Sequence, residues 1–258
     1  MAMFRIGCHV ALVVWKLGVC AALTAPAIAG GGEPTNEPVY RAVIVAGADI
    51  TKNADEAYSG VYYAFNGDLS REGFILRLFG TRGFYDYRTL PNDGNYWQGD
   101  VMVGYQWVRG RVDVGVYIGV DYQHYDLAAP DPFNELQGSE TGFKVALDIE
   151  TNDRNTSPLY FAFNGAYSTA FDTYYALARV GRTFGRFTIG PEAWALGDVT
   201  GDAQRLGAFV SMEIPLGYNM TGTLTLSAGH QFGDEAVTSK GFDDGLYGTV
   251  NFRMPLGR

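Results

Sequence analysis

Apolar and polar residues alternate along two consecutive runs near the middle of the chain. The first reads Asp-Val-Met-Val-Gly-Tyr-Gln-Trp over residues 100–107, and the second reads Arg-Val-Asp-Val-Gly-Val-Tyr-Ile-Gly-Val-Asp over residues 111–121. A period of two is typical of a β-strand. The intervening Arg109-Gly110 is a two-residue turn signal with glycine second. The pattern therefore predicts a tight hairpin.

The register of this hairpin can be predicted from the alternation. If Val108 faces Arg111, then Trp107 faces Val112, and the apolar residues of both runs share one face. A slip by one residue would mix the two faces, so the pairing is well specified. On the apolar face, Trp97 is then expected to pair with Tyr122.

Aromatic residues at both ends of the apolar face favour a membrane barrel over a β-sandwich. About ten residues at roughly 3.4 Å each, tilted by about 45°, span on the order of 24 Å. This is about the height of the apolar band between the aromatic girdles of an outer-membrane barrel. Ordinary core aromatics are the alternative. The predicted girdle residues are Trp97, Tyr105, Trp107 and Tyr122.

The rest of the chain repeats the strand pattern, and no segment has a convincing helical period. No apolar run reaches the length of a transmembrane helix. The predicted fold is all-β, a single up-and-down antiparallel transmembrane β-barrel of about 12 strands. The predicted strands are 39–50, 57–66, 73–88, 96–108, 111–125, 139–150, 158–167, 173–184, 187–197, 203–214, 221–232 and 245–255.

Connection lengths support the same fold in part. The even-to-odd connections include the tight Arg109-Gly110 and Gly185-Arg186, whereas the odd-to-even connections include the long 126–138 and 233–244. Short turns on the periplasmic side and longer external loops are the habit of outer-membrane barrels. The connections 151–157 and 168–172 do not fit this division.

The first 29 residues have the features of a cleaved export signal. Arg5 and Lys16 provide positive charge, an apolar run follows at 17–23, and Ala-Ile-Ala at 27–29 is a small-residue cleavage site. A lipoprotein signal ending at Cys20 is a weaker alternative, because a valine precedes the cysteine. The predicted organisation is a signal peptide at 1–29, a flexible lead-in at 30–38 and a barrel at 39–258.

Charge and cysteine content exclude some kinds of chemistry and some classes of partner. Cys8 and Cys20 both lie in the predicted signal, so the mature chain would have no disulfide and no catalytic thiolate. Removing the signal removes two of the 19 basic residues and none of the 28 acidic ones, which leaves a net charge of −11. An acidic chain without a basic cluster argues against nucleic-acid binding.

Charged residues recur on the polar face of the predicted strands. They would line the lumen, either as a charged path that selects a solute or as a self-neutralising network that plugs the barrel. Pairing Phe184 with Phe187 would place Arg179 opposite Glu192, which stabilises a ladder modestly. The predicted lumen-lining residues are Arg77, Asp100, Arg111, Asp113, Asp121, Lys144, Asp148, Arg179, Glu192, Arg205 and Glu213.

Catalytic patterns are sparse, and we expect no enzyme, no cofactor and no metal. His124 and His230 lie near strand ends on the lipid-facing side, and neither has a second histidine near it in the sequence. The candidate hydrolase serines, Ser139, Ser168 and Ser227, have no nucleophile elbow around them.

Two groups of loop residues have alternative interpretations. The loop carboxylates could bind a divalent cation or bridge to lipopolysaccharide, but their spacing matches no calcium-loop pattern and favours solvated loop charge. They are Asp126, Asp131, Glu135, Asp234, Glu235, Asp243 and Asp244. Aromatics near the loops could stack on sugar rings or belong to the girdle. They are Tyr85, Tyr87, Tyr96, Trp97 and Tyr125.

Several segments in order resemble one family, the cellulose biosynthesis protein BcsS family. They include Asn-Gly-Asp-Leu-Ser-Arg-Glu-Gly-Phe-Ile-Leu-Arg-Leu at 66–78, Gly-Asp-Val-Met-Val-Gly-Tyr-Gln-Trp at 99–107 and Gly-Ser-Glu-Thr-Gly-Phe-Lys-Val at 138–145. Further segments are 167–174, 186–192 and 202–210. The resemblance implies an accessory protein of bacterial cellulose production in the outer membrane, and it transfers no catalytic residue.

The sequence departs from outer-membrane barrels at its end. Such barrels usually end on an aromatic residue that helps insertion, whereas here Phe252 is followed by further residues through Arg258.

Three hypotheses follow. The leading one is a non-enzymatic outer-membrane barrel, a porin-like conduit or anchoring element for exopolysaccharide (β-1,4-glucan) secretion. Its partners would be outer-membrane lipid, cellulose and cellulose secretion components, with no nucleic acid. The second is a plugged barrel that binds polysaccharide or a partner. The third is an outer-membrane hydrolase or a soluble periplasmic β-sandwich.

Overall fold

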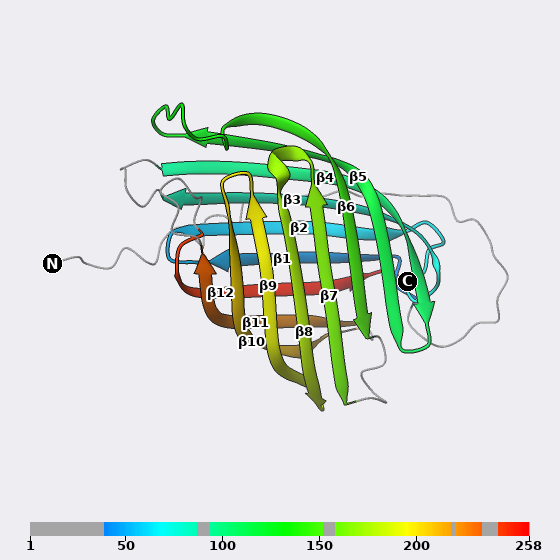
Figure 1. The fold of residues 1–258 in the computed structure, drawn as a ribbon. Helices are drawn as coiled ribbons and strands as arrows, with labels where there is room; N and C mark the ends of the chain where they lie inside the picture. Colours follow the sequence, from blue (N-terminus) through cyan, green and yellow to red (C-terminus); the bar gives the residue numbers. More distant parts are fainter. Residues whose placement is uncertain (1–38, 87–92, 152–157, 218–219, 234–241, 258) are drawn as a thin grey trace. The chain divides into compact units, whose positions relative to one another are not determined.

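The computed structural model describes residues 39–86, 93–151, 158–217, 220–233 and 242–257. The predicted signal peptide, the lead-in and the alternative lipoprotein site at Cys20 lie outside them. The described chain is a closed antiparallel barrel of twelve strands in sequence order (Figure 1). The strands are β1 (Ala42–Ile50), β2 (Ala54–Ala64), β3 (Gly73–Asp86), β4 (Asp93–Arg109), β5 (Val112–Leu127), β6 (Gly138–Thr151), β7 (Leu159–Ser168), β8 (Tyr174–Phe184), β9 (Phe187–Asp198), β10 (Gly201–Gly217), β11 (Met220–Gly233) and β12 (Gly245–Leu256).

The sheet closes between its first and last strands. β1 pairs with β12 from Ala42 opposite Leu256 to Ile50 opposite Gly248, and it pairs with β2 on its other side. Closure satisfies the backbone of every strand without leaving an open edge. The predicted twelve-strand barrel is confirmed, and the β-sandwich hypothesis is wrong.

Strand bounds differ from the predicted ones by a few residues. β2 begins at Ala54 rather than at residue 57, and β1 begins at Ala42 rather than at residue 39. The short turns 110–111 and 185–186 lie at the barrel end where β1 begins and β12 ends, and the long 128–137 connection lies at the opposite end. A 3-10 helix, η1 (Ala170–Asp172), occupies the connection between β7 and β8.

The predicted register of the β4–β5 hairpin is wrong, although its faces are right. The turn consists of Gly110 and Arg111, and Arg109 lies opposite Val112. Gly110 has φ +61°, so the glycine occupies the first turn position, where a left-handed backbone is required. Every pair is therefore shifted by two residues, which preserves the faces. Trp97 lies opposite His124 rather than Tyr122.

The predicted register of the β8–β9 hairpin is confirmed. Phe184 lies opposite Phe187 across the Gly185-Arg186 turn, and Arg179 lies opposite Glu192. Gly185 has φ +60°, which again places glycine first in the turn.

The barrel wall has two chemically different surfaces. On β4 and β5, outward side chains such as Val101, Ile118 and Val120 are 51–59% exposed, while inward Asp100 and Asp121 are 5% and 1% exposed. The alternation of side chains along each strand separates the two sets. Within the described residues, no helix is long and apolar enough to cross a bilayer.

Candidate functional site in the barrel lumen

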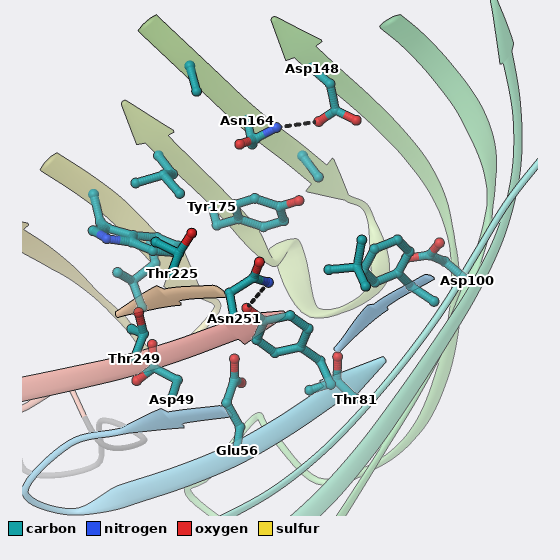
Figure 2. Close-up of a pocket in the computed structure, with 18 of the residues that line it drawn as sticks. Asp49, Glu56, Thr81, Asp100, Asp148, Asn164, Tyr175, Thr225, Thr249 and Asn251 are labelled. Atoms are coloured by element: carbon teal, nitrogen blue, oxygen red, sulfur yellow. Dashed lines mark hydrogen bonds between the residues drawn. The ribbon is translucent and has the colours of Figure 1, made fainter. Parts of the chain in front are cut away.

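The lumen contains a cavity of about 490 Å³ lined by residues of all twelve strands. Tyrosines, carboxylates and small polar side chains make up much of its surface. Figure 2 shows Asp49, Glu56, Tyr175 and Asn251 around this cavity, with Asp148 on the opposite wall. The cavity forms because the inward residues of neighbouring strands alternate with lipid-facing ones around a closed ring.

A buried lysine joins two facing aspartates. Asp100 of β4 lies opposite Asp121 of β5, and the Nζ of Lys144 on β6 lies 2.7 Å from Asp100 Oδ2 and 3.7 Å from Asp121 Oδ1. The three side chains are 13% exposed or less. The single positive charge offsets repulsion between two carboxylates that would otherwise destabilise the pair.

The predicted Arg179–Glu192 pair is the centre of a larger network. Arg179 Nε donates to Glu192 Oε2 at 2.7 Å. Ser227 Oγ donates to the same oxygen at 2.9 Å, and Tyr247 donates to Oε1 at 2.8 Å. Trp194 Nε1 donates to Oε1 at 3.0 Å. Glu192 is therefore buried with its carboxylate fully engaged, as a buried charge requires.

Further bonds join strands that are not neighbours. Arg205 of β10 contacts Asp49 of β1 at 2.5 Å. Tyr62 of β2 donates to Asp148 of β6 at 3.1 Å. Asn164 of the adjacent strand β7 donates to the same carboxylate at 2.9 Å (Figure 2). Interactions of this kind stiffen the ring and narrow the lumen.

One ion pair joins opposite sides of the barrel across the lumen. Arg253 of β12 lies 2.6 Å from Glu150 of β6, and these strands are on opposite sides of the twelve-strand ring. The side chains of Arg253 and Glu150 are 49% and 26% exposed, so this pair is wetter than the pairs at mid-strand. Tyr160 also donates to Glu150, at 3.2 Å. The pair crosses the lumen toward the end where the chain terminates.

The predicted lumen residues fall into three groups. Seven line the cavity: Arg77, Asp100, Asp113, Lys144, Asp148, Arg179 and Arg205. Asp121 and Glu192 are buried under their partners, and Glu213 is partly buried near the end of β10. The placement of Arg111 is a correction, because it lies exposed in the Gly110-Arg111 turn.

Six charged cavity residues were absent from the predicted set, namely Asp49, Asp55, Glu56, Glu150, Asp198 and Arg253. Glu150 continues the alternation of Lys144 and Asp148 on β6, so the sequence pattern could have indicated that it points inward. Glu56 fell outside the predicted strand because β2 begins three residues earlier.

The four predicted girdle residues lie at the two ends of the outward face. Trp97 contacts Tyr122 at 4.8 Å between ring centroids, although the two are diagonal rather than opposite. Tyr105 contacts Trp107 at 4.9 Å toward the other end of β4.

Three loop-side tyrosines do not belong to the outward girdle. Tyr85, Tyr96 and Tyr125 point inward and pack with Leu136 in a buried cluster, in which the Tyr96 and Tyr125 rings stack at 5.3 Å. They are 1–5% exposed, and Tyr96 also lines the lumen cavity. Tyr87 lies outside the described residues.

The loop carboxylates that the structure describes lie in separate environments. Asp131 caps the Phe133 amide, and Asp243 is buried beneath the loop end of the barrel. Asp234 and Glu235 lie outside the described residues. Among the residues described, no group of three or more histidines, cysteines or acids is arranged to hold a metal ion.

The histidines and serines separate into two environments. Ser227 and Ser168 are buried inward, and Ser227 serves the Glu192 network. His230 stacks on Phe232 on the outer wall. Ser139 and His124, by contrast, lie opposite one another and are hydrogen-bonded at 2.6 Å.

Comparisons with known proteins agree on the fold. The sequence profile of the family described as cellulose biosynthesis protein BcsS matches residues 43–256. No match was found among curated proteins. The translocator domain of the autotransporter NalP from Neisseria meningitidis is 11% identical, with a TM-score of 0.52 over 86% of this chain and 90% of that one. This likeness shows the barrel fold alone.

Two other solved structures are similar. The β domain of the Bordetella autotransporter BrkA has 13% identity and a TM-score of 0.45 over 85% of this chain and 100% of that one. The KdgM porin in complex with disordered oligogalacturonate has 10% identity and a TM-score of 0.42 over 83% of this chain and 99% of that one.

Proposed function

Since the chain belongs to the cellulose biosynthesis protein BcsS family, we propose that it is an outer-membrane accessory protein of bacterial cellulose secretion. In this role it is exported by a signal peptide cleaved after residue 29. Its lumen acts as a narrow, porin-like conduit for a β-1,4-glucan chain and needs no catalysis. The exposed apolar face between two aromatic groups supports the membrane location, because this arrangement matches the lipid-facing band of membrane barrels.

The observation that carries the conduit proposal is the enclosed cavity lined by all twelve strands. Tyr58, Tyr62 and Trp194 present aromatic surface to it, and Asp49 and Glu56 present carboxylates. A glucan is uncharged, its pyranose rings have apolar C–H faces, and its hydroxyls donate hydrogen bonds. Aromatic rings and acceptor oxygens are therefore complementary to it.

A specific observation favours the second candidate, a plugged barrel that binds polysaccharide. The Arg253–Glu150 pair crosses the lumen, and the cavity volume of about 490 Å³ lies in the range of ligand pockets of roughly 300–1,000 Å³. A chain that enters such a lumen would be held rather than passed if this pair stays closed.

Conductance in planar bilayers separates the two. The conduit predicts steady single-channel current for the mature protein and a partial block when cello-oligosaccharides are added to either side. A reconstituted barrel that carries no steady current while it binds cello-oligosaccharides would favour the plugged module.

A deletion strain tests the pathway itself. We expect less exported cellulose with synthase levels unchanged, and restoration by the wild-type gene. Normal cellulose export in the deletion strain would contradict both candidates.

A further inference from the structure

A serine, a histidine and an aspartate form a continuous hydrogen-bonded chain on the outer wall. The Oγ of Ser139 lies 2.6 Å from Nδ1 of His124, and Nε2 of His124 lies 3.1 Å from Oδ2 of Asp126. Tyr122 donates to Ser139 Oγ at 2.9 Å. Ser139 belongs to β6 and the other three to β5, which are adjacent strands (Figure 1).

This chain has the order of groups that activates a serine. With the ring proton on Nε2 and donated to Asp126, Nδ1 of His124 is free to accept the proton of Ser139. Either ring nitrogen can serve as the base, because the carboxylate fixes the tautomer through the other one. Asp126 is 59% exposed and His124 is 28% exposed, so a substrate can approach from outside.

The position points to a lipid as the substrate. His124 lies 6.1 Å from the ring centre of Trp97, which also contacts Tyr122 at the loop-side end of the outward face. Below this point the wall exposes Val101, Val120 and Phe143. Aromatic belts lie at the headgroup level of a bilayer. The acyl esters of a lipid would thus reach the serine while the acyl chains follow the apolar wall.

The amide of Ser139 itself is available as a donor for an oxyanion. In the described chain the pairing of β6 with β7 begins only at Lys144, and the Phe143 amide donates toward that side, to Thr169 Oγ1 at 2.9 Å. Amide directions alternate along a strand, so the amides of Ser139 and Thr141 point to the same side, ahead of the paired region. The Ser139 amide can therefore donate to an oxygen held near its own Oγ.

From these observations we propose that Ser139, His124 and Asp126 form a hydrolase site for acyl esters of membrane lipids, separate from the lumen. Ser139 Oγ attacks the ester carbonyl carbon, and its proton passes to His124. The C–O bond to the alcohol breaks, and the alcohol leaves with that proton. Water then cleaves the acyl-serine in the same way, so that ester and water become alcohol and fatty acid.

The lipid substrate rests on the proposed membrane location. The first test is therefore one that does not depend on that location. The folded mature protein in detergent micelles is treated with a fluorophosphonate probe, which labels activated serines. Wild type should be labelled at Ser139, and Ser139→Ala and His124→Gln should lose the label. Ser59→Ala is the matched control, because Ser59 is also on the outward face, and it should label like wild type.

The second test measures fatty-acid release from vesicles of phosphatidylethanolamine and, separately, of lipid A. Release from either supports the site and identifies the lipid. We expect Ser139→Ala and His124→Gln to slow it by about 10³-fold or more, and Asp126→Asn by less. The proposal is overturned if heat-modifiable, folded protein shows neither label nor release, or if labelling survives His124→Gln.

Discussion

The inner and outer walls of the barrel use the same strands for opposite purposes. On the inner wall, the side chains of Arg179, Glu192 and Lys144 are at most 13% exposed, and each has a charged partner within 2.7 Å. On the outer wall, aliphatic side chains such as Ile118 are exposed, and the polar trio around Ser139 lies at its loop-side edge. The difference indicates that the low-polarity surroundings lie outside the barrel and the polar surroundings inside it.

The largest expected effect comes from breaking an inner pair. Glu192→Ala leaves Arg179 buried without its carboxylate, so we expect the free energy of unfolding to fall by about 3–5 kcal/mol. Urea unfolding in lipid vesicles measures it. The double variant Arg179→Ala/Glu192→Ala should lose less than the single variant. A single variant as stable as wild type would show that the inner charges are hydrated in an open lumen.

A charge on the outer wall should have the next largest effect. Ile118→Arg places a guanidinium in the apolar band, and the expected loss is about 2–4 kcal/mol near the bilayer midplane. Thr81→Arg, on the cavity lining, is the matched control. It should lower the free energy of unfolding by no more than about 1 kcal/mol, since water in the lumen can hydrate the new guanidinium. Equal losses for the two variants would contradict the assignment of the walls.

The smallest stability effect is expected at the cross-lumen pair. Arg253→Gln removes a partly exposed ion pair, which typically contributes about 0.2–1 kcal/mol. The same variant should increase single-channel conductance, because the link between β12 and β6 is lost. Arg82→Gln, on the outward face of β3, controls for the loss of a positive charge. Unchanged conductance would mean that Arg253 does not limit passage.

The fold could be predicted from the sequence because alternation, glycine turns and strand count are local signals. The two Gly-Arg turns show where local reasoning reaches its limit. Both use glycine first, at φ +61° and +60°. Reading Gly185 as first gave the correct register, whereas reading Gly110 as second shifted that hairpin by two residues. Because the side-chain period is two, the faces survived this error.

Partners across the lumen could not be predicted from alternation. Arg253 and Glu150 are about a hundred residues apart, and their contact depends on the diameter of the closed ring and on strand stagger. The Ser139–His124 contact depends on the β5–β6 register across a ten-residue connection, which the hydrophobic pattern does not fix. The sequence therefore identified Ser139 and His124 as candidate residues but did not predict their contact.

The most direct test of the central claim is the environment of spin labels at alternating positions of β4. Both cysteines lie before residue 21, so single cysteines can be introduced into a mature chain without background. Labels at Val101 and Val103 should collide with oxygen dissolved in lipid, and labels at Gln98 and Gln106 with a water-soluble nickel complex. If labels at all four positions collided equally with the nickel complex, the wall could not face acyl chains on its outer side and water on its inner side.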